Sequence, residues 1–215
     1  MSLRKVPFAP GEYYHIYNRG NSKQTIFHDK ADYDRFLKLL FLSNGEENFK
    51  VQFIGKNIYE FNRGKELVHV GAYCLMPNHF HLLLTQAQDG GISKFIQKLS
   101  TGYSMYYNKK YERSGTLFEG KFKSQHAGED NYMKYLFSYI HLNPIKLIDK
   151  NWKERGIKNK TRAISYLEKY RYSSFVDYLG WDRLEKKIIN PSKFPDYFSK
   201  TAAHKNELFE WLDFN

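Results

Sequence analysis

Apolar residues follow two periodicities along the chain, and these divide it into predicted strands and predicted helices. Alternation over residues 13–20 and 67–86 indicates strands, and the second segment is interrupted at Pro77-Asn78, a typical turn pair. We therefore expect an antiparallel hairpin over residues 67–86. Three further segments have apolar side chains at the spacing of an amphipathic helix. The predicted helices cover residues 28–43, the residues from Ile92 to the break at Ser114-Gly115, and residues 128–144.

The segments between these elements have weaker patterns. Residues 49–66 predict a short hairpin or a variable loop, and the basic, aromatic residues 115–125 predict a strand or an ordered loop. We interpret the polar stretch 150–160 as a linker and the remainder, including the sequence ELFEWLDF near the end, as a small helical extension. The chain is thus divided into a domain over residues 1–149 and a linker with C-terminal extension over residues 150–215.

The order of the elements indicates the fold class. Strands and helices follow one another as β-α-β-β-α-β, and a further helix comes after the last strand. This order favours an antiparallel sheet with helices packed on one face, which is the α+β class. A length of 215 residues is sufficient to bury a core in such a domain.

The charge balance points to an anionic partner. The chain has 34 Lys and Arg residues against 23 Asp and Glu residues, which gives a net charge of +11. Such an excess favours nucleic acid or an anionic membrane surface. Aromatic residues make up 18% of the chain, and aromatic rings among cations suit single-stranded nucleic acid, because bases can stack while Lys and Arg follow the phosphates. The same composition also fits a protein whose aromatic residues fill the core and whose charges face solvent.

Several kinds of protein are excluded or disfavoured. The single cysteine, Cys74, excludes an intramolecular disulfide and a cysteine-rich zinc site. No apolar run approaches the length of a membrane span, and the opening sequence MSLRKVPFAP lacks the apolar stretch of a signal peptide. We therefore expect a cytoplasmic protein that does not enter a membrane.

The sequence PNHFHLLL, residues 77–84, carries candidate chemistry. Side chains two positions apart on a strand point to the same face, so His79 and His81 project together. Phe80 and Leu82 then point the other way, into the core. Two neutral imidazoles in this arrangement are suitable metal ligands. The spacing alone gives about equal support to the alternative that these are two unrelated histidines and not a pair of metal ligands.

A metal site needs at least one more ligand. His69, His126 and His141 are candidates, and a set of three histidines would suit zinc in a hydrolase. Asn143 is a neutral oxygen donor. Together with the histidine pair it would leave positions open for phosphate oxygens, which suits Mg²⁺ or Mn²⁺ better than a closed zinc site.

The sequence SYIHLNP, residues 138–144, adds a candidate nucleophile. Tyr139 and Asn143 are four residues apart and share a face if the helix continues to Asn143. A tyrosine beside a metal can attack a phosphodiester while the metal draws charge from the non-bridging oxygens. Core packing is the competing interpretation, because Tyr132, Tyr135 and Tyr139 also lie at the spacing of an apolar helix face.

In order and combination, several segments resemble the IS200/IS605-type transposases, specifically the branch of REP-associated tyrosine transposases. This combination is far more specific than the histidine spacing alone. The matching segments run from about Gly11 to Gly180 and are YYHIYNRGNSKQTIF, AYCLMPNHFHLLL, YYNKKYERSGTLFEGKFKS, YLFSYIHLNPIK and YRYSSFVDYLG.

The resemblance implies a fold, a site and an activity. PNHFHLLL is similar to the family's HUH motif, where U is a bulky hydrophobe, so His79 and His81 would bind the metal. Tyr139 would be the nucleophile, and Asn143 would complete a site for Mg²⁺ or Mn²⁺. The family fold is ferredoxin-like, in agreement with the element order. Members cut single-stranded DNA, often next to a hairpin, and form a 5′-phosphotyrosine and a 3′-OH that can later rejoin strands.

The resemblance also implies the partner. We expect single-stranded or hairpin DNA, bound by a monomer or by a homodimer, with the site built within one chain or shared between two. A domesticated relative that binds hairpin DNA or structured RNA without cutting it is the alternative. Basic residues in the matching segments would flank the site and contact phosphates. These residues are Arg19, Arg113, Lys121 and Lys123.

Two parts of the chain depart from the family pattern. The segment from Glu46 to Gly64 is long for a connection between the first helix and the hairpin, and the residues after Trp181 have no counterpart that we can place. Neither part includes the proposed chemistry, but both could alter target recognition.

Overall fold

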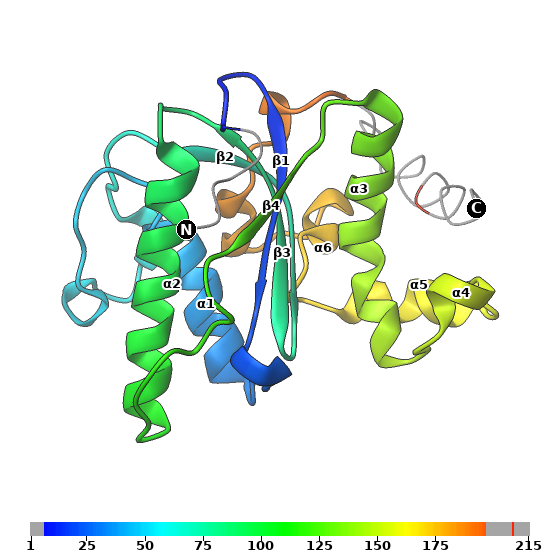
Figure 1. The fold of residues 1–215 in the computed structure, drawn as a ribbon, viewed down its shortest axis with the longest axis horizontal. Coiled ribbons are helices and arrows are strands. Elements are labelled where there is room, and N and C mark those ends of the chain that lie inside the picture. Colours follow the sequence, from blue (N-terminus) through cyan, green and yellow to red (C-terminus); the bar gives the residue numbers. More distant parts are fainter. Residues whose placement is uncertain (1–6, 197–207, 209–215) are drawn as a thin grey trace.

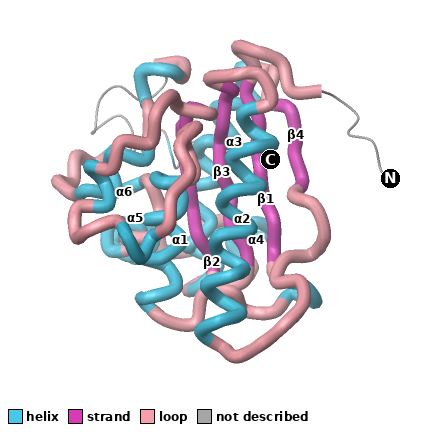
Figure 2. Tube along the Cα trace, turned by 90° about the vertical axis from the view of Figure 1, so that its left-hand side faces the viewer, coloured by secondary structure: helices cyan, strands magenta, loops and turns pink. Residues whose placement is uncertain are grey.

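A four-stranded antiparallel sheet forms the centre of this computed structural model, which describes residues 7–196 and residue 208. The strands lie in the order β2-β3-β1-β4, so β3 and β1 are central and β2 and β4 form the edges (Figure 2). This is the strand order of a ferredoxin-like sheet. The predicted hairpin is confirmed, with its turn at Pro77-Asn78. The strands are β1 (Tyr13–Arg19), β2 (Val68–Met76), β3 (His79–Gln86) and β4 (Lys123–His126).

Two helices cover one face of the sheet. These helices, α1 (Lys30–Leu42) and α2 (Gly91–Lys110), pack against each other on the left in Figure 1. The largest hydrophobic cluster lies between them and the sheet, and Phe36, Phe80 and Tyr103 are fully buried in it. The long apolar side chains at helical spacing thus form the core that their periodicity predicts.

A third helix lies on the opposite face. This helix, α3 (Asp130–Leu142), packs against β2 and β3 through a second cluster that includes Phe137 and Ile140 (Figure 1). The α+β class is confirmed. The prediction that the helices pack on one face of the sheet holds for α1 and α2. Helix α3 covers the other face, because both faces of the sheet have apolar side chains. Helical backbone continues past Pro144 as a 3-10 turn, Asn143–Leu147.

The pattern of β2 changes at Gly71. The register against β3 shifts between Val70 and Ala72, which marks a β-bulge. Val70 belongs to the cluster beneath α1 and α2, and regular alternation would put Ala72 there too, but Ala72 belongs to the cluster beneath α3. A β-carbon on Gly71 would lie 2.7 Å from the ring of Phe194, so a larger residue would have to displace that ring.

The segments with weaker patterns are mostly loops. Residues 49–66 contain two 3-10 turns, Val51–Phe53 and Ile58–Glu60, and no strand, so the variable-loop interpretation applies. Residues 115–122 form an ordered loop that leads into β4, which begins at Lys123. The predicted linker is corrected, because it contains a short helix, α4 (Trp152–Arg155), whose first side chain is buried.

The C-terminal extension is helical in much of the part that the structure describes. The sequence ELFEWLDF lies outside the described residues apart from Leu208, and the domain division at residue 149 stays a prediction. Within the described ranges, no helix combines the length and the apolar character that crossing a membrane requires. The elements of the extension are α5 (Lys160–Lys169), α6 (Phe175–Tyr178) and the 3-10 turns Leu184–Ile188 and Pro191–Lys193; another such turn, Asn21–Lys23, follows β1.

A buried ion pair fixes the extension to β2. Arg183 donates to the carboxylate of Asp177 at 2.6 Å and to the hydroxyl of Tyr73 on β2 at 2.8 Å. The Asp177 side chain is fully buried, and that of Arg183 is only 9% exposed. The backbone amide of Ser174 also donates to the carbonyl of Tyr73 at 3.0 Å. The extension is therefore held against the edge strand by polar contacts as well as by packing.

Candidate active site

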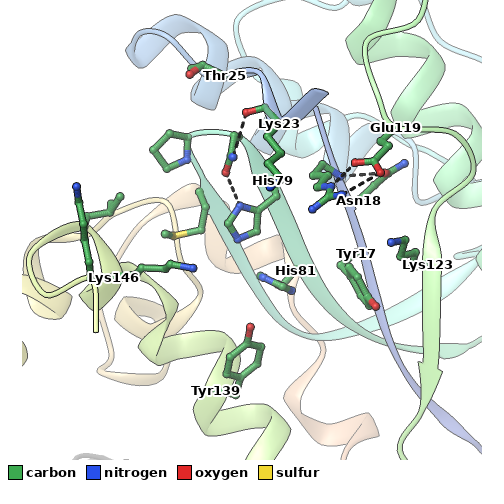
Figure 3. A pocket seen from close by; sticks show the side chains of 16 residues that line it. Tyr17, Asn18, Lys23, Thr25, His79, His81, Glu119, Lys123, Tyr139 and Lys146 are labelled. Carbon is green, nitrogen blue, oxygen red and sulfur yellow. Dashed lines mark hydrogen bonds and ion pairs between the residues drawn. The ribbon is translucent and has the colours of Figure 1, made fainter. Parts of the chain in front are cut away.

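A cavity of about 740 Å³ lies at the end of the sheet where the hairpin turn approaches β1 and the C-terminal part of α3. Its wall includes both predicted histidine ligands and the predicted nucleophile, together with cations from several elements (Figure 3). The lining residues that matter most for the chemistry are Arg19, His79, His81, Lys123, Tyr139 and Lys146.

The strand pleat brings the two histidines together as their spacing predicts. His79 and His81 lie on β3 with ring centroids 4.9 Å apart, and both line the cavity. Phe80 and Leu82 are fully buried on the other face, in the core beneath α1 and α2. Because these apolar neighbours anchor a central strand, the imidazoles are held by a rigid element of the fold.

His81 is oriented by His15 on the neighbouring strand. Nε2 of His15 lies 2.8 Å from Nδ1 of His81, and both side chains are buried. Nε2 of His81 is also buried, and it has no hydrogen-bond partner in the described part of the chain. The arrangement suits the tautomer in which Nδ1 of His81 carries the proton, which leaves Nε2 with the lone pair that binds a metal.

His79 is oriented by the residue that precedes it. Its Nδ1 lies 2.6 Å from Oδ1 of Asn78, which is an acceptor, so Nδ1 carries a proton and Nε2 keeps its lone pair. The amide nitrogen of Asn78 donates to the backbone carbonyl of Lys23 at 3.2 Å, which fixes the orientation of the amide. Each histidine thus uses one ring nitrogen for an orienting hydrogen bond, as metal-ligating histidines do.

Burial keeps the imidazoles neutral. It lowers the pKa of His15 and the pKa of His79 to about 4, and it holds the pKa of His81 well below the ordinary value. The positive charges of Lys146 and Lys153 lower the pKa of His79 and of His81 further. Since a metal ion binds neutral imidazole, the histidine pair is in its ligating form at neutral pH.

Tyr139 faces the histidines from α3. Its ring centroid lies 5.5 Å from that of His81 and 6.2 Å from that of His15, in edge-to-face arrangements. Figure 3 shows the phenolic oxygen directed toward the histidines. The ring packs partly against the second cluster, but among the described residues the hydroxyl has no hydrogen-bond partner. Tyr139 therefore combines the core-packing role with a hydroxyl that opens into the cavity.

Asn143 lies one turn after Tyr139. The backbone there is still helical, with φ −49° and ψ −39°, and the side-chain nitrogen donates to the carbonyl of Tyr139 at 2.8 Å. The side chain is buried, and Asn143 is not among the described residues that line the cavity. The structure therefore places it beside the site, at the end of α3, and its role as a metal ligand stays a prediction.

The other candidate histidines lie outside the cavity lining in the described ranges. The described residues contain no group of three or more His, Cys, Asp or Glu side chains placed to hold a metal ion. Among the described residues, none of these three candidates joins His79 and His81, and His15 is hydrogen-bonded to His81, so the zinc alternative lacks the third ligand that it requires. Each of the three candidates is instead hydrogen-bonded elsewhere: His69 with Glu66, His126 with Glu12, and His141 with Ser174.

The predicted phosphate contacts are only partly brought together. Arg19 and Lys123 line the cavity. Lys121 is exposed but does not belong to the described part of that lining. Arg113 follows the end of α2, where its guanidinium lies over the ring of Tyr107 at 5.5 Å from the centroid.

Arg19 is already paired with an acidic side chain. Its Nε and Nη2 both donate to the carboxylate of Glu119, and the second bond measures 2.9 Å. The hydrogen bond from Arg19 lowers the pKa of Glu119, so the carboxylate stays ionised. A phosphate that binds Arg19 must therefore compete with Glu119 for the guanidinium.

Sequence reasoning missed several residues of the site. His15 is visible in the sequence as an alternating position, but only the pairing of β1 with β3 places it beside His81. Lys146 and Lys150 line the cavity, and Lys153 contacts Tyr139. These lysines lie at the end of the tyrosine-bearing segment and in the predicted linker, where no periodicity marks them as functional.

A comparison with protein families decides the affiliation. A family model described as "Transposase IS200 like" matches residues 11–143, which is more than half of the chain. The chain belongs to the IS200-like transposase family. The matched region of this IS200-like transposase includes the histidine pair, Tyr139 and Asn143, and it ends where the 3-10 turn after α3 begins.

A solved structure shares the fold of this IS200-like transposase. It is a REP-associated tyrosine transposase bound to a REP hairpin, with a TM-score of 0.54 and 12% sequence identity. The similarity covers 86% of this chain and 90% of that chain. At this identity the likeness concerns the fold. No match is found among curated proteins.

Proposed function

We propose that this IS200-like transposase cuts and rejoins single-stranded DNA with Tyr139 as the nucleophile. The observation that carries the proposal is the approach of Tyr139 to the histidine pair, with 5.5 Å between its ring centroid and that of His81. A phosphodiester in the cavity would contact the phenolic oxygen and the histidine face together. The catalytic domain would span residues 1–149, flanked by the extension over residues 150–215.

The proposed chemistry is a reversible transesterification. The phenolic oxygen of Tyr139 attacks the phosphorus, the tyrosyl O–P bond forms, and the bond to the 3′ oxygen breaks. The phenol loses its proton and the departing 3′ oxygen gains one, which gives a 5′-phosphotyrosine and a free 3′-OH. Attack of a 3′-OH on the phosphotyrosine reverses these changes and joins strands. Because each step exchanges one phosphodiester for another, no ATP is needed.

The residues of the cavity fit a divalent metal ion. His79 and His81 present neutral imidazoles on one face, and the buried Nε2 of His81 has no partner among the described residues. These two donors, with Asn143 as the third, would hold Mg²⁺ or Mn²⁺ and leave positions for water and phosphate oxygens. When bound, the ion would supply a Lewis acid that stabilises negative charge on the phosphate.

Hairpin-flanked single-stranded DNA is the proposed substrate, and we place the chain in the REP-associated branch. The solved relative of the same fold is bound to a REP hairpin. The charge of this chain supports the same class of partner, because its net charge is +11 and four lysines from three parts of the chain line the cavity. These lysines are Lys23, Lys123, Lys146 and Lys150.

The test compares wild type with Tyr139→Phe on labelled hairpin-flanked single-stranded DNA in the presence of Mn²⁺. We expect a covalent protein–DNA adduct from wild type and none from the variant, because phenylalanine has no nucleophilic oxygen. Equal adduct formation by both proteins would show that another residue attacks. Salt-dependent binding by wild type, without cleavage under any divalent ion, would support the non-catalytic relative instead.

A second variant separates chemistry from binding. His79→Ala is expected to abolish cleavage but to leave DNA affinity mostly intact, because phosphate contacts from Lys and Arg dominate that affinity. A matched loss of DNA binding and cleavage in His79→Ala would contradict the assignment of His79 to the metal.

A further inference from the structure

A cation lies on the face of the proposed nucleophile. Nζ of Lys153 is 3.8 Å from the ring centroid of Tyr139. Lys153 belongs to α4, which lies in the segment predicted as a linker, and it follows the residues 11–143 that the family model matches. Neither the family match nor the sequence motifs therefore assign it a role.

The contact with Tyr139 is easily exchanged. Lys153 is exposed, and the described ranges contain no carboxylate paired with it. An exposed ammonium gains little from an aromatic ring, whereas a charge-assisted hydrogen bond to a phosphate oxygen is considerably stronger. A phosphate that enters the cavity would therefore draw Lys153 away from the ring face.

The charge of Lys153 also reaches the histidines. After burial, Lys153 is the next cause that lowers the pKa of His15, and it contributes to the lowered pKa of His79 and of His81. The ammonium is thus within electrostatic range of the groups that would surround a bound phosphate. Lys146, which lines the cavity after α3, acts on His79 and His81 in the same way.

We propose that Lys153 is a catalytic residue that binds a non-bridging oxygen of the scissile phosphate and keeps this contact in the 5′-phosphotyrosine. This inference rests on the proposed function of Tyr139. The phenolic oxygen lies at the edge of the ring that Lys153 covers, and the flexible lysine stem can carry Nζ from the ring face to a phosphate on that oxygen. Negative charge that shifts onto the non-bridging oxygens during attack is stabilised by this ammonium.

The bonds that change remain those of the transesterification. The tyrosyl O–P bond forms while the bond to the 3′ oxygen breaks, and Lys153 neither forms nor breaks a covalent bond. Because the phosphorus remains attached to Tyr139 between the two steps, one cation beside that ring can serve both cutting and rejoining. A lysine beside the nucleophile can therefore act in both steps, which a lysine that contacts only the bound DNA cannot do.

The test measures single-turnover adduct formation and DNA affinity for Lys153→Met, Lys153→Arg and the control Lys158→Met. Methionine keeps much of the apolar stem and removes the charge, arginine keeps the charge, and Lys158 is an exposed lysine outside the described cavity lining. We expect Lys153→Met to slow adduct formation about 10- to 100-fold, less than the loss of an enclosed donor, because the cavity is open to solvent.

The dissociation constants distinguish this catalytic role from a general electrostatic contribution to DNA binding. The dissociation constant of Lys153→Met should rise less than about threefold, since one phosphate contact among many is lost. Lys153→Arg should recover most of the rate, and Lys158→Met should match wild type. All three variants should melt like wild type, because both lysines are exposed.

A phosphorothioate distinguishes phosphate contact from packing. Once sequencing of the wild-type adduct has located the scissile phosphate, each diastereomer of a single sulfur substitution is tested there. The ratio of the two cleavage rates should change in Lys153→Met and stay at the wild-type value in Lys158→Met, because Lys153 contacts one of the two non-bridging oxygens.

The outcomes distinguish this inference from the function on which it rests. If wild type forms no adduct through Tyr139, both are overturned. If wild type forms the adduct but Lys153→Met reacts at the same rate and with the same diastereomer ratio, only the role of Lys153 is overturned. A slower Lys153→Met that arginine does not restore, with an unchanged diastereomer ratio, also overturns that role and leaves the nucleophile assignment standing.

Discussion

His15 and His81 form a hydrogen bond between two buried imidazoles on neighbouring strands, with Nε2 of His15 2.8 Å from Nδ1 of His81. The bond fixes both the rotation of the His81 ring and the nitrogen that it presents to the cavity. His15 therefore acts on the proposed metal through His81, as a positioning residue.

His15→Phe is expected to weaken binding of Mn²⁺ about 10- to 100-fold, because partners that orient metal-ligating histidines have effects of this size. Phenylalanine fills the space but cannot hydrogen-bond to His81. His15→Gln should lose less affinity, since its amide can accept or donate. Calorimetric titration of DNA-free protein gives the affinity, and His126→Gln, an exposed histidine outside the described cavity lining, is the control. Wild-type affinity in His15→Phe would show that His81 needs no partner.

Glu119→Gln is expected to raise affinity for single-stranded DNA about two- to fivefold, the size of an exposed ion pair. The substitution frees the guanidinium of Arg19 for a phosphate. The slope of log affinity against log salt concentration should become steeper by the amount expected for about one additional phosphate contact. Fluorescence anisotropy over a salt series measures both, and Glu60→Gln, an exposed residue in the loop between α1 and β2, is the control. Weaker binding by Glu119→Gln would mean that Glu119 holds Arg19 in its binding position.

Asp32→Asn is expected to lower the free energy of unfolding at neutral pH by about 1–3 kcal/mol. Asp32 is buried and accepts hydrogen bonds from Lys110 at 2.7 Å and Tyr111 at 2.7 Å. Burial by itself would raise the pKa of Asp32, but the hydrogen bonds, led by the one from Lys110, outweigh it and hold the pKa below its ordinary 3.8. Urea unfolding of both proteins measures the difference.

The lowered pKa of Asp32 determines how its contribution to the free energy of unfolding changes with pH. The contribution of Asp32 to stability is present above the unfolded pKa of 3.8 and is lost as the pH falls through the folded pKa. The gap between wild type and Asp32→Asn should therefore narrow on acidification below about pH 4. Asp182→Asn, an exposed carboxylate, should show no such gap. A gap that is constant with pH would refute the charged state of Asp32.

Arg183→Met is expected to destabilise the protein by about 3–5 kcal/mol, because it leaves the carboxylate of Asp177 buried without its cation. Burial already raises the pKa of Asp177 in spite of Arg183. Adding Asp177→Asn to Arg183→Met should recover part of the loss, and the double-mutant cycle measures the coupling. Arg171→Met, which removes a half-exposed partner of Glu185 at 3.6 Å, should cost about 1 kcal/mol or less. Equal losses from both arginines would show that burial of the pair is unimportant.

Local rules predicted the parts of the site that depend on one strand or one helix. The period of two placed His79 and His81 on one face of β3, and the period of the helix gave α3 with Tyr139 on it. The turn residues Pro77 and Asn78 gave the hairpin. Each of these inferences needs only neighbours in the sequence, which is why it succeeded.

Inferences that needed contacts across the fold failed or were not made. His15 meets His81 only through strand pairing, and Glu119 meets Arg19 across a hundred residues of chain. The second face of the sheet was not predicted to bear a helix, because that expectation followed the order of the elements and not the side chains on each face. Lys153 was missed because its polar surroundings resemble a linker, although α4 folds back onto the nucleophile.

The bulge at Gly71 determines which face of the sheet each side chain from Ala72 to Met76 occupies. If Gly71 instead paired as an ordinary strand residue, even alternation would send Tyr73 toward the nucleophile helix and turn Met76 away from the cavity that it lines. One residue added to β2 after the bulge would put a whole row of side chains on the opposite face, whereas the same addition in residues 49–66 would lengthen a surface connection. The long loop can therefore accept an added residue, whereas β2 between the bulge and the hairpin turn cannot.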